Sequence, residues 1–183
     1  MEVVELEMTE FPVPVSRTTR SNGLHLTPII HDLLQTLAGK EEVKNSFDPQ
    51  FYWECGYLFE DMMGEVMARR YVVDHPGEAE LDGVVGSPDG IVVITTKLVV
   101  VEYKWTSKSM RNLPETNRAW LMQNMGYCKM LGSTSGRFVV MYNNGDYKPP
   151  RPTPYACDIH YTAGELDENW MMIVNHAKYR GWL

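Results

Sequence analysis

The sequence predicts an α/β fold in which helices flank a central mixed β-sheet. Residues 27–38 and 48–70 carry apolar side chains at helical spacing, and each segment begins with a polar residue followed by proline, which is typical of a helix start. Residues 81–104 are instead rich in Val and Ile, which is typical of strands. A third helical segment at residues 114–131 precedes an apolar strand at residues 137–142.

The order of these segments predicts how the sheet is connected. Turn residues interrupt residues 81–104 twice, so we expect three short strands in a meander. The last of these strands, the helix at residues 114–131 and the strand at residues 137–142 predict a right-handed crossover. The two strands that the crossover joins are therefore expected to be parallel.

The two ends of the chain follow other patterns. Alternating apolar residues predict a fifth strand at residues 155–161, and Thr162 with Glu165 three residues later forms the pattern of a capping box that begins a last helix. Residues 1–20 mix β-branched residues with prolines, so we expect an extended N-terminal arm. No internal repeat is evident, and we expect residues 1–183 to form a single domain.

The composition narrows the class of protein. The chain has 183 residues, of which 44% are hydrophobic, and a formal net charge of −7, which fits a soluble globular domain. No stretch approaches the roughly 18 consecutive apolar residues of a membrane span, and the acidic N-terminus lacks the basic region of a signal peptide. We therefore expect a cytoplasmic protein without a membrane partner. The negative charge also argues against tight nonspecific binding to long duplexes.

The cysteines give no sign of a disulfide framework or a zinc site. Cys55, Cys128 and Cys157 are an odd, scattered set without a C-x-x-C motif. Their simplest interpretation is as core residues in a reducing compartment.

A hairpin within residues 81–104 gathers charged side chains. Glu102 and Lys104 are two residues apart on a strand, so both side chains face the same side. If residues 96–97 form a two-residue turn, Asp89 lies opposite Lys104 and on that same face. A three-residue turn would instead move Asp89 to the other face, so the prediction depends on register.

Two carboxylates and a lysine beside an apolar run are costly to desolvate unless their charge is compensated. A divalent cation would compensate it, and hard oxygen ligands without His or Cys favour Mg²⁺ or Mn²⁺ over zinc. An ordinary exposed hairpin with a cross-strand pair between Asp89 and Lys104 explains the same spacing. The spacing alone does not decide between the two interpretations.

The residues around the hairpin carry a resemblance. Pro88-Asp89, twelve intervening residues and then Glu102-Tyr103-Lys104 resemble the signature of the PD-(D/E)XK nuclease superfamily. This resemblance implies a restriction-endonuclease-like core with the element order αβββαβ, which matches the order of helices and strands expected above.

Two further motifs strengthen the resemblance. Gly56, followed four residues later by Glu60, resembles the first acidic motif of the superfamily. Gln123 and Tyr127, with three residues between them, match the QxxxY motif of the RecB-like branch, which includes the phage lambda-type exonucleases. The resemblance covers residues 50–142, which we take as the catalytic core.

Glu60 also stands out on physical grounds. Gly56 and Gly64 lie four residues before and after it on one helix face, and a glycine inside a helix costs roughly 1 kcal/mol relative to alanine. We expect this bare strip to let the helix approach the sheet closely and to lean Glu60 over the hairpin carboxylates. Glu65 is the alternative if the alignment of the motif is shifted.

The resemblance implies a metal-dependent deoxyribonuclease with a defined set of site residues. Asp89, Glu102, Glu60 and the main-chain carbonyl of Tyr103 would hold one or two Mg²⁺ or Mn²⁺ ions. Lys104 would position or deprotonate the attacking water, or neutralise charge that develops on the phosphoryl group. The expected products carry 5′-phosphate and 3′-hydroxyl ends.

A second set of residues is expected to bind the substrate. The resemblance implies that Gln123 and Tyr127 steady the nucleic acid and the reacting phosphate. Arg118, Lys108 and Arg111 are candidate phosphate contacts because they lie on the same helix or in the loop after the site. Isolated basic residues are more often solvated surface, so Lys108 and Arg111 are the weaker part of the prediction.

The RecB-like motif favours an exonuclease that resects DNA ends in phage or host recombination and repair, acting in the bacterial host cytoplasm if it is phage-encoded. The alternatives are a structure-selective or restriction-type endonuclease and a catalytically inactive, nuclease-like binding module. Some CRISPR-associated relatives hold a four-iron cluster on four cysteines; three cysteines predict no iron–sulfur cluster here. DNA is the expected partner, and a protein partner or homo-oligomer stays open.

Overall fold

The computed structural model describes residues 21–39 and 50–183; the predicted arm at residues 1–20 and the predicted helix start at residues 48–49 lie outside them. In order along the chain, the helices and strands are β1 (Leu24–His25), α1 (Leu26–Ala38), α2 (Gln50–Ala68), β2 (Val73–Asp74), β3 (Ala79–Leu81), β4 (Val84–Gly86), β5 (Gly90–Ile94), β6 (Lys97–Thr106), the 3₁₀ turn η2 (Pro114–Thr116), α3 (Arg118–Leu131), β7 (Ser135–Tyr142), β8 (Thr153–His160) and α4 (Ala163–Tyr179).

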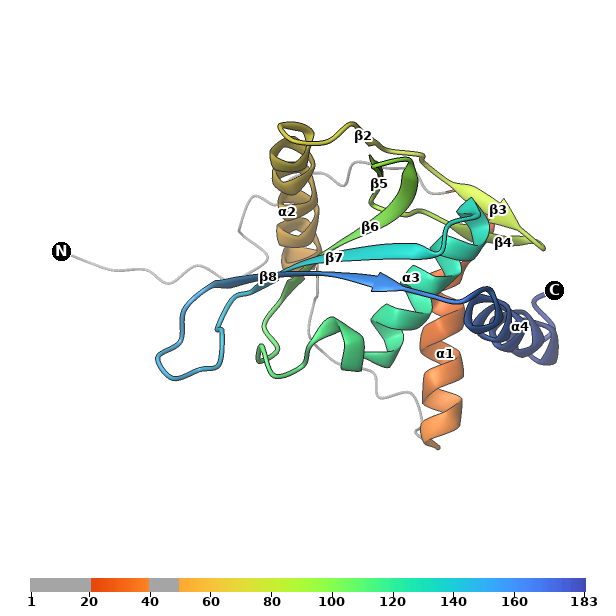
Figure 1. Ribbon diagram of the computed structural model, residues 1–183. Coiled ribbons are helices and arrows are strands. Elements are labelled where there is room, and N and C mark those ends of the chain that lie inside the picture. Colours follow the sequence, from red (N-terminus) through yellow and green to blue (C-terminus); the bar gives the residue numbers. More distant parts are fainter. Residues whose placement is uncertain (1–20, 40–49) are drawn as a thin grey trace.

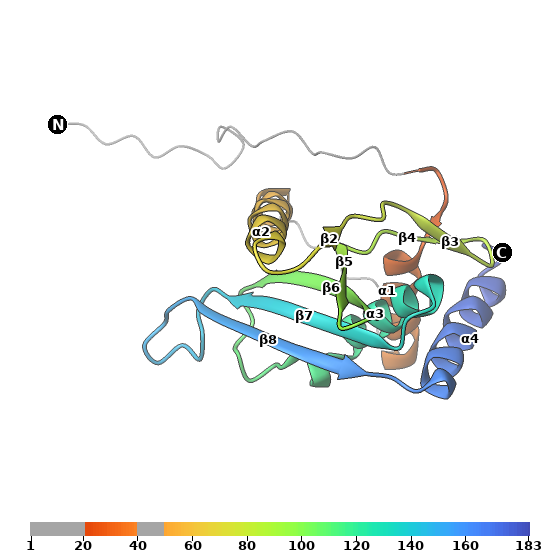
Figure 2. The same cartoon turned by 45° about the horizontal axis from the view of Figure 1, so that its top comes forward.

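Two sheets form the centre of the molecule. The larger sheet has the strand order β2-β5-β6-β7-β8, and the smaller one has the order β1-β4-β3. Among the described helices, α2 packs against one face of the larger sheet, whereas α1, α3 and α4 lie on the opposite side (Figure 1). In the tilted view of Figure 2, α2 is likewise separated from α1, α3 and α4 by the strands of the larger sheet.

The predicted fold class is confirmed. A mixed central sheet is flanked by helices, and the elements that build it follow the order α2, β2, β5, β6, α3, β7, which is αβββαβ. The predicted parallel pair is also present, since β6 and β7 run parallel and α3 connects them. This connection places the first turns of α3 beside the carboxyl-terminal half of β6.

The predicted meander is wrong in one respect. Strand β4 leaves the main sheet and pairs with β3 and β1, while the short strand β2 pairs with β5 instead. Asp82 and Gly83 turn the β3–β4 hairpin with positive φ angles of 50° and 78°. A two-residue strand such as Val73–Asp74 carries too short a pattern to be recognised in the sequence.

The predicted hairpin register is shifted by one residue along each strand. Thr95 and Thr96 form the turn, with φ angles of 57° and 106°, and Ile94 pairs with Lys97. Two consecutive positive φ angles usually require Gly or Asn, so the threonines did not fix the position of the turn that the sequence predicted at residues 96–97. The predicted turn and the observed turn each contain two residues, so the register changes by an even number and the face expected for Asp89 is the same.

Strand β6 divides the core between the two faces of the sheet. Val99, Val101 and Tyr103 are buried against Phe59 of α2. Val100 is fully buried in the larger cluster that α1, α3 and α4 form on the other side. Because side chains alternate along a strand, Glu102 and Lys104 follow Val100 onto the α3 face.

Several helix ends match their predicted signals and others differ by a few residues. The Thr162–Glu165 capping box is present, and Gly132 ends α3 in the left-handed conformation with φ of 66°. The region before α3 is a separate 3₁₀ turn, and Asn117 caps the helix by accepting a hydrogen bond from the Trp120 amide at 3.4 Å. Helix α1 begins one residue before Thr27, which leaves the threonine hydroxyl available for other contacts. Within the described parts of the chain, no helix has the length and apolar character needed to cross a bilayer.

Candidate active site

Glu102 is the centre of the candidate site. Its carboxylate is completely buried, with 0% of the residue exposed, and it accepts a hydrogen bond from the ammonium group of Lys104 through Oε1. The other oxygen, Oε2, is buried and has no hydrogen-bond partner among the described residues. A buried carboxylate oxygen without a partner is costly unless a bound group compensates it.

Asp89 reaches the same region from the turn before β5. Its Oδ2 accepts a hydrogen bond from the Tyr103 amide at 2.7 Å, which ties the turn to β6 beside Glu102. The register of the hairpin pairs Gly90 with Val101, so Asp89 comes next to Glu102 rather than to Lys104. Asp89 also borders a cavity with residues of α2, so the shared face of Asp89, Glu102 and Lys104 stays a prediction.

The buried charges shift one another's protonation. The pKa of Glu102 is raised to about 8: burial is the largest cause, the Asp89 carboxylate also raises the pKa, and the charge of Lys104 lowers it. Burial works against the charged form of Lys104, yet the carboxylates of Glu102 and Asp89 together hold its pKa above the ordinary value. Because both pKa values are raised, Glu102 and Lys104 both hold their protons more strongly than usual, as expected where carboxylates outnumber cationic groups.

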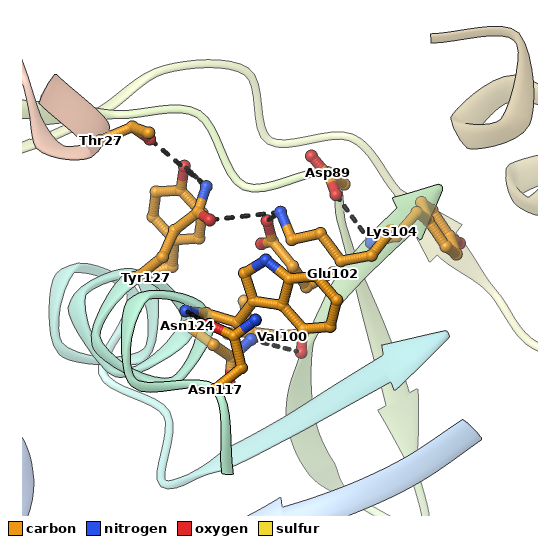
Figure 3. Close-up of polar contacts among 11 residues, drawn as sticks. Thr27, Asp89, Val100, Glu102, Lys104, Asn117, Asn124 and Tyr127 are labelled. Atoms are coloured by element: carbon orange, nitrogen blue, oxygen red, sulfur yellow. Dashed lines mark hydrogen bonds and ion pairs between the residues drawn. The ribbon is translucent and has the colours of Figure 1, made fainter. Parts of the chain in front are cut away.

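Gln123 joins Lys104 to the surrounding helices. Its Oε1 accepts a hydrogen bond from Lys104 Nζ at 3.2 Å, while its Nε2 donates to the Tyr127 hydroxyl oxygen at 3.0 Å and to Thr27 Oγ1 at 3.3 Å. Figure 3 shows Thr27 from α1, Tyr127 from α3 and Lys104 from β6 meeting at this point. The predicted QxxxY pair thus forms part of one network with the predicted lysine.

Two glycines allow α3 to come close enough for this network. A Cβ atom on Gly86 would lie 2.8 Å from the Tyr127 ring, and one on Gly136 would lie 1.8 Å from Asn124 Oδ1. Asn124 is fully buried and donates a hydrogen bond to the carbonyl of Val100 at 3.4 Å. These contacts hold α3 close to β6, the strand that carries Glu102.

Glu60 lies on the other side of the sheet from Glu102. It borders a cavity of about 410 Å³, whose lining residues come from α2, from the segment after β2 and from the turn before β5. Those residues are Glu60, Asp61, Gly64, Glu65, His75 and Asp89. Glu60 thus meets the hairpin through Asp89, and its charge contributes to the raised pKa of Glu102. Glu65, the alternative in the sequence, faces the same cavity.

The expected role of the two helix glycines is only partly right. Nothing lies within 4 Å of a Cβ built on Gly56, so this glycine is not required for close packing against the sheet. At Gly64, the neighbour is the imidazole of His75, with Cε1 at 3.4 Å and Nε2 at 3.5 Å from such a Cβ. The bare helix face accommodates a histidine ring instead of the sheet.

The three basic candidates for phosphate contacts are placed differently. Lys108 extends over the Trp120 ring, 5.6 Å from its centroid, and is close enough to the site to affect His31. Arg111 is exposed in the segment after β6. Arg118 is also exposed, and its guanidinium lies 3.9 Å from the sulfur of Met172 on α4.

Three residues of the site region were missed in the sequence. Thr27 contacts Gln123, and His31, one turn further along α1, lies near Lys104, since partial burial and the charges of Lys104 and Lys108 lower the pKa of His31. His75 contacts the Asp89 carbonyl. The polar face of α1 offered a weak signal at four-residue spacing, whereas a histidine in a connecting segment offered none.

The residues present fit a hard divalent cation in their chemistry. Two carboxylates, from Asp89 and Glu102, and the predicted carbonyl donor of Tyr103 are the oxygen ligands that Mg²⁺ and Mn²⁺ prefer, and the partnerless Glu102 oxygen belongs to this set. Residues 21–39 and 50–183 contain no group of three or more His, Cys, Asp or Glu side chains with the arrangement of a metal site. The three cysteines are free and lie on α2, α3 and β8.

Comparisons with known proteins identify relatives in fold. No protein-family model matches the sequence, and no curated protein matches it. The alkaline exonuclease LHK-Exo from Laribacter hongkongensis superposes with a TM-score of 0.52 at 13% identity, over 86% of this chain and 87% of that one. A phage-related exonuclease from Haemophilus somnus 129PT gives a TM-score of 0.53 at 13% identity, over 83% of this chain and 78% of that one. The chain thus has a fold that is found in exonuclease structures.

Proposed function

We propose that the chain is a divalent-metal-dependent deoxyribonuclease of the PD-(D/E)XK type that hydrolyses DNA phosphodiester bonds. The observation that carries the proposal is the fully buried carboxylate of Glu102, with one oxygen on Lys104 and the other without a partner among the described residues. Asp89 stands beside it. A divalent cation between these carboxylates would compensate their charge and would bind a phosphate oxygen.

Each residue of the site has a role in this reaction. When bound, one or two Mg²⁺ or Mn²⁺ ions supply an activated water and neutralise phosphate charge; Asp89, Glu102 and the Tyr103 carbonyl would hold them, with Glu60 facing the same cavity as Asp89. The water oxygen bonds to phosphorus as the P–O3′ bond breaks; the attacking water loses a proton to solvent and O3′ takes one up from solvent, which leaves a 5′-phosphate and a 3′-hydroxyl. Lys104, kept protonated by its carboxylate neighbours, offsets the charge that develops on the phosphoryl oxygens.

The network beyond Lys104 supports substrate positioning. Gln123 fixes the ammonium group of Lys104 while Tyr127 and Thr27 hold the Gln123 amide, so the lysine needs little reorganisation when a phosphate arrives. Lys108 is the basic candidate whose charge, like that of Lys104, acts on His31, and we assign it to a flanking phosphate.

We further propose that the enzyme is an exonuclease that resects DNA ends in recombination or repair. Two structural neighbours are named as exonucleases, and one structure of LHK-Exo contains dAMP. The QxxxY pair, here Gln123 and Tyr127, is in contact with the predicted lysine, as expected for the RecB-like branch. Magnesium or manganese, rather than zinc, follows from the oxygen-only donor set.

Release of acid-soluble nucleotides from labelled DNA tests the nuclease proposal. The wild-type chain is expected to release nucleotides with Mg²⁺ and not with EDTA, and Lys104→Ala is expected to lose most of this activity. Lys97→Ala is the matched control, because Lys97 lies at the opposite end of the same strand and is exposed. Equal signals from all four reactions would refute the enzyme and leave a binding module.

A comparison of linear and covalently closed DNA tests the exonuclease proposal separately. An enzyme that requires ends degrades the linear molecule and leaves the closed circle intact. Nicking or linearisation of the closed circle at a comparable rate would instead identify an endonuclease, with the same metal chemistry.

A further inference from the structure

His75 contacts the main chain of Asp89. Its Nδ1 lies 2.8 Å from the Asp89 carbonyl oxygen. A carbonyl oxygen only accepts hydrogen bonds, so Nδ1 carries the hydrogen in this contact. The contact spans 14 residues of sequence, and it arises because β2, which ends one residue before His75, pairs with β5, which begins one residue after Asp89.

Asp89 is therefore held at two points. The Tyr103 amide donates to its carboxylate at 2.7 Å, and His75 donates to its carbonyl at 2.8 Å. One bond fixes the side chain relative to β6, and the other fixes the backbone from which that side chain projects. Together they restrict the rotation that would turn the carboxylate away from Glu102.

The other side of the imidazole packs against α2. Gly64 presents no side chain there, and a Cβ at this position would lie 3.4 Å from Cε1 and 3.5 Å from Nε2 of His75. Glu60 lies one turn earlier on the same helix, and it borders the same cavity as His75 and Asp89. The ring thus lies between the helix that carries Glu60 and the turn that carries Asp89.

We propose that His75 is a positioning residue, which holds Asp89 and the adjacent face of α2 in the geometry needed to bind a divalent cation. This inference rests on the proposed function. Loss of a hydrogen-bond partner that orients a metal ligand typically weakens metal affinity roughly 10- to 100-fold. His75 acts on the backbone of the ligand rather than on its carboxylate, so we expect about a tenfold loss, near the lower end of that range.

Calorimetric titration with Mn²⁺ of the purified, metal-free chain tests the proposal without relying on activity. The variants are His75→Ala and His75→Leu, which remove the donor, and His75→Asn, whose side-chain NH₂ is attached at the same Cγ position as Nδ1. We expect about tenfold weaker Mn²⁺ binding for Ala and Leu and binding within about twofold of the wild type for Asn. Because the ring is exposed, all three variants are expected to fold, which thermal melts in EDTA would check.

His160→Ala is the matched control. His160 also makes a ring-nitrogen hydrogen bond, 3.0 Å from Ser135 Oγ, but it lies at the far end of β7 and β8. Its loss should leave Mn²⁺ affinity unchanged. Wild-type affinity in His75→Ala and His75→Leu would overturn the positioning role, and so would equal losses in His75→Asn and His75→Ala. Failure of the wild-type chain to bind Mn²⁺ would instead overturn the proposed function.

Discussion

The two sides of the candidate site differ in how firmly the structure holds their side chains before any cation or substrate binds. On the α3 side, Lys104, Gln123 and Tyr127 form a closed network in which the lysine is only 19% exposed. On the α2 side, Glu60 and Asp89 border a cavity of about 410 Å³. The positive group of the site is thus immobilised by the fold, while space is left beside the carboxylates. A site that must admit a cation and a phosphate needs this asymmetry.

The largest effect is expected from the carboxylates that join the two sides. Asp89→Asn keeps an oxygen that accepts the Tyr103 amide but removes the charge, so we expect a loss on the order of 10³-fold in nucleotide release at saturating Mg²⁺. Glu80→Gln, an exposed acid on β3, is the control. Activity of Asp89→Asn within a few-fold of the wild type would remove Asp89 from the site.

A smaller effect on the cavity side should separate the two candidate helix acids. We expect Glu60→Gln to reduce activity roughly 10- to 100-fold, because it would affect the cation through water or a neighbouring ligand. Glu65→Gln should change activity little, although Glu65 borders the same cavity. Initial rates across a Mg²⁺ titration would measure both, and a larger loss for Glu65→Gln would show that the acidic motif is misaligned.

On the network side, Gln123→Ala should have a moderate effect. The substitution removes one hydrogen bond to a charged partner, worth about 1.5–3 kcal/mol, which corresponds to a decrease of roughly 10- to 100-fold in kcat. Gln35→Ala, on an exposed turn of α1, is the matched control. If kcat stayed at the wild-type value and only the melting temperature changed, Gln123 would serve packing and not the reaction.

The smallest effect is on stability in the absence of metal. Glu102 keeps its proton up to about pH 8 in the folded chain, against an ordinary pKa of 4.5. The folded state thus binds more protons than the unfolded state between these values, and its stability falls as the pH rises from about 5 to 8. We expect the melting temperature in EDTA to fall by a few degrees over this range in the wild type and less in Glu102→Gln. A parallel decrease in both would mean that Glu102 is not the cause.

The sequence was sufficient for the parts of the fold with a long pattern. The helices at α1 and α3, the parallel pair of β6 and β7 and the capping box at Thr162 were all predicted from periodicity and capping residues. The strands that were misassigned are two or three residues long, and their pairing depends on tertiary contacts that leave no local signal. The turn after β5 was predicted one residue too late, because neither Thr95 nor Thr96 is typical of positive φ.

For the site, the sequence predicted the charged groups but not how they are supported. Asp89, Glu102, Lys104 and Gln123 lie in one region, although the spacing had placed Asp89 opposite Lys104 and the register brings it next to Glu102. The support from His75 depends on the pairing of β2 with β5, which brings together residues that are 14 apart and otherwise unrelated. No periodic pattern in one sequence records such a contact.

The most direct test of the account is an anomalous difference map from a crystal soaked in Mn²⁺. We expect a peak bound by a carboxylate oxygen of Asp89 and by Glu102 Oε2, the buried oxygen that has no hydrogen-bond partner among the described residues. A map without a peak there, with Glu102 paired to Lys104 alone and Asp89 turned toward solvent, would contradict it.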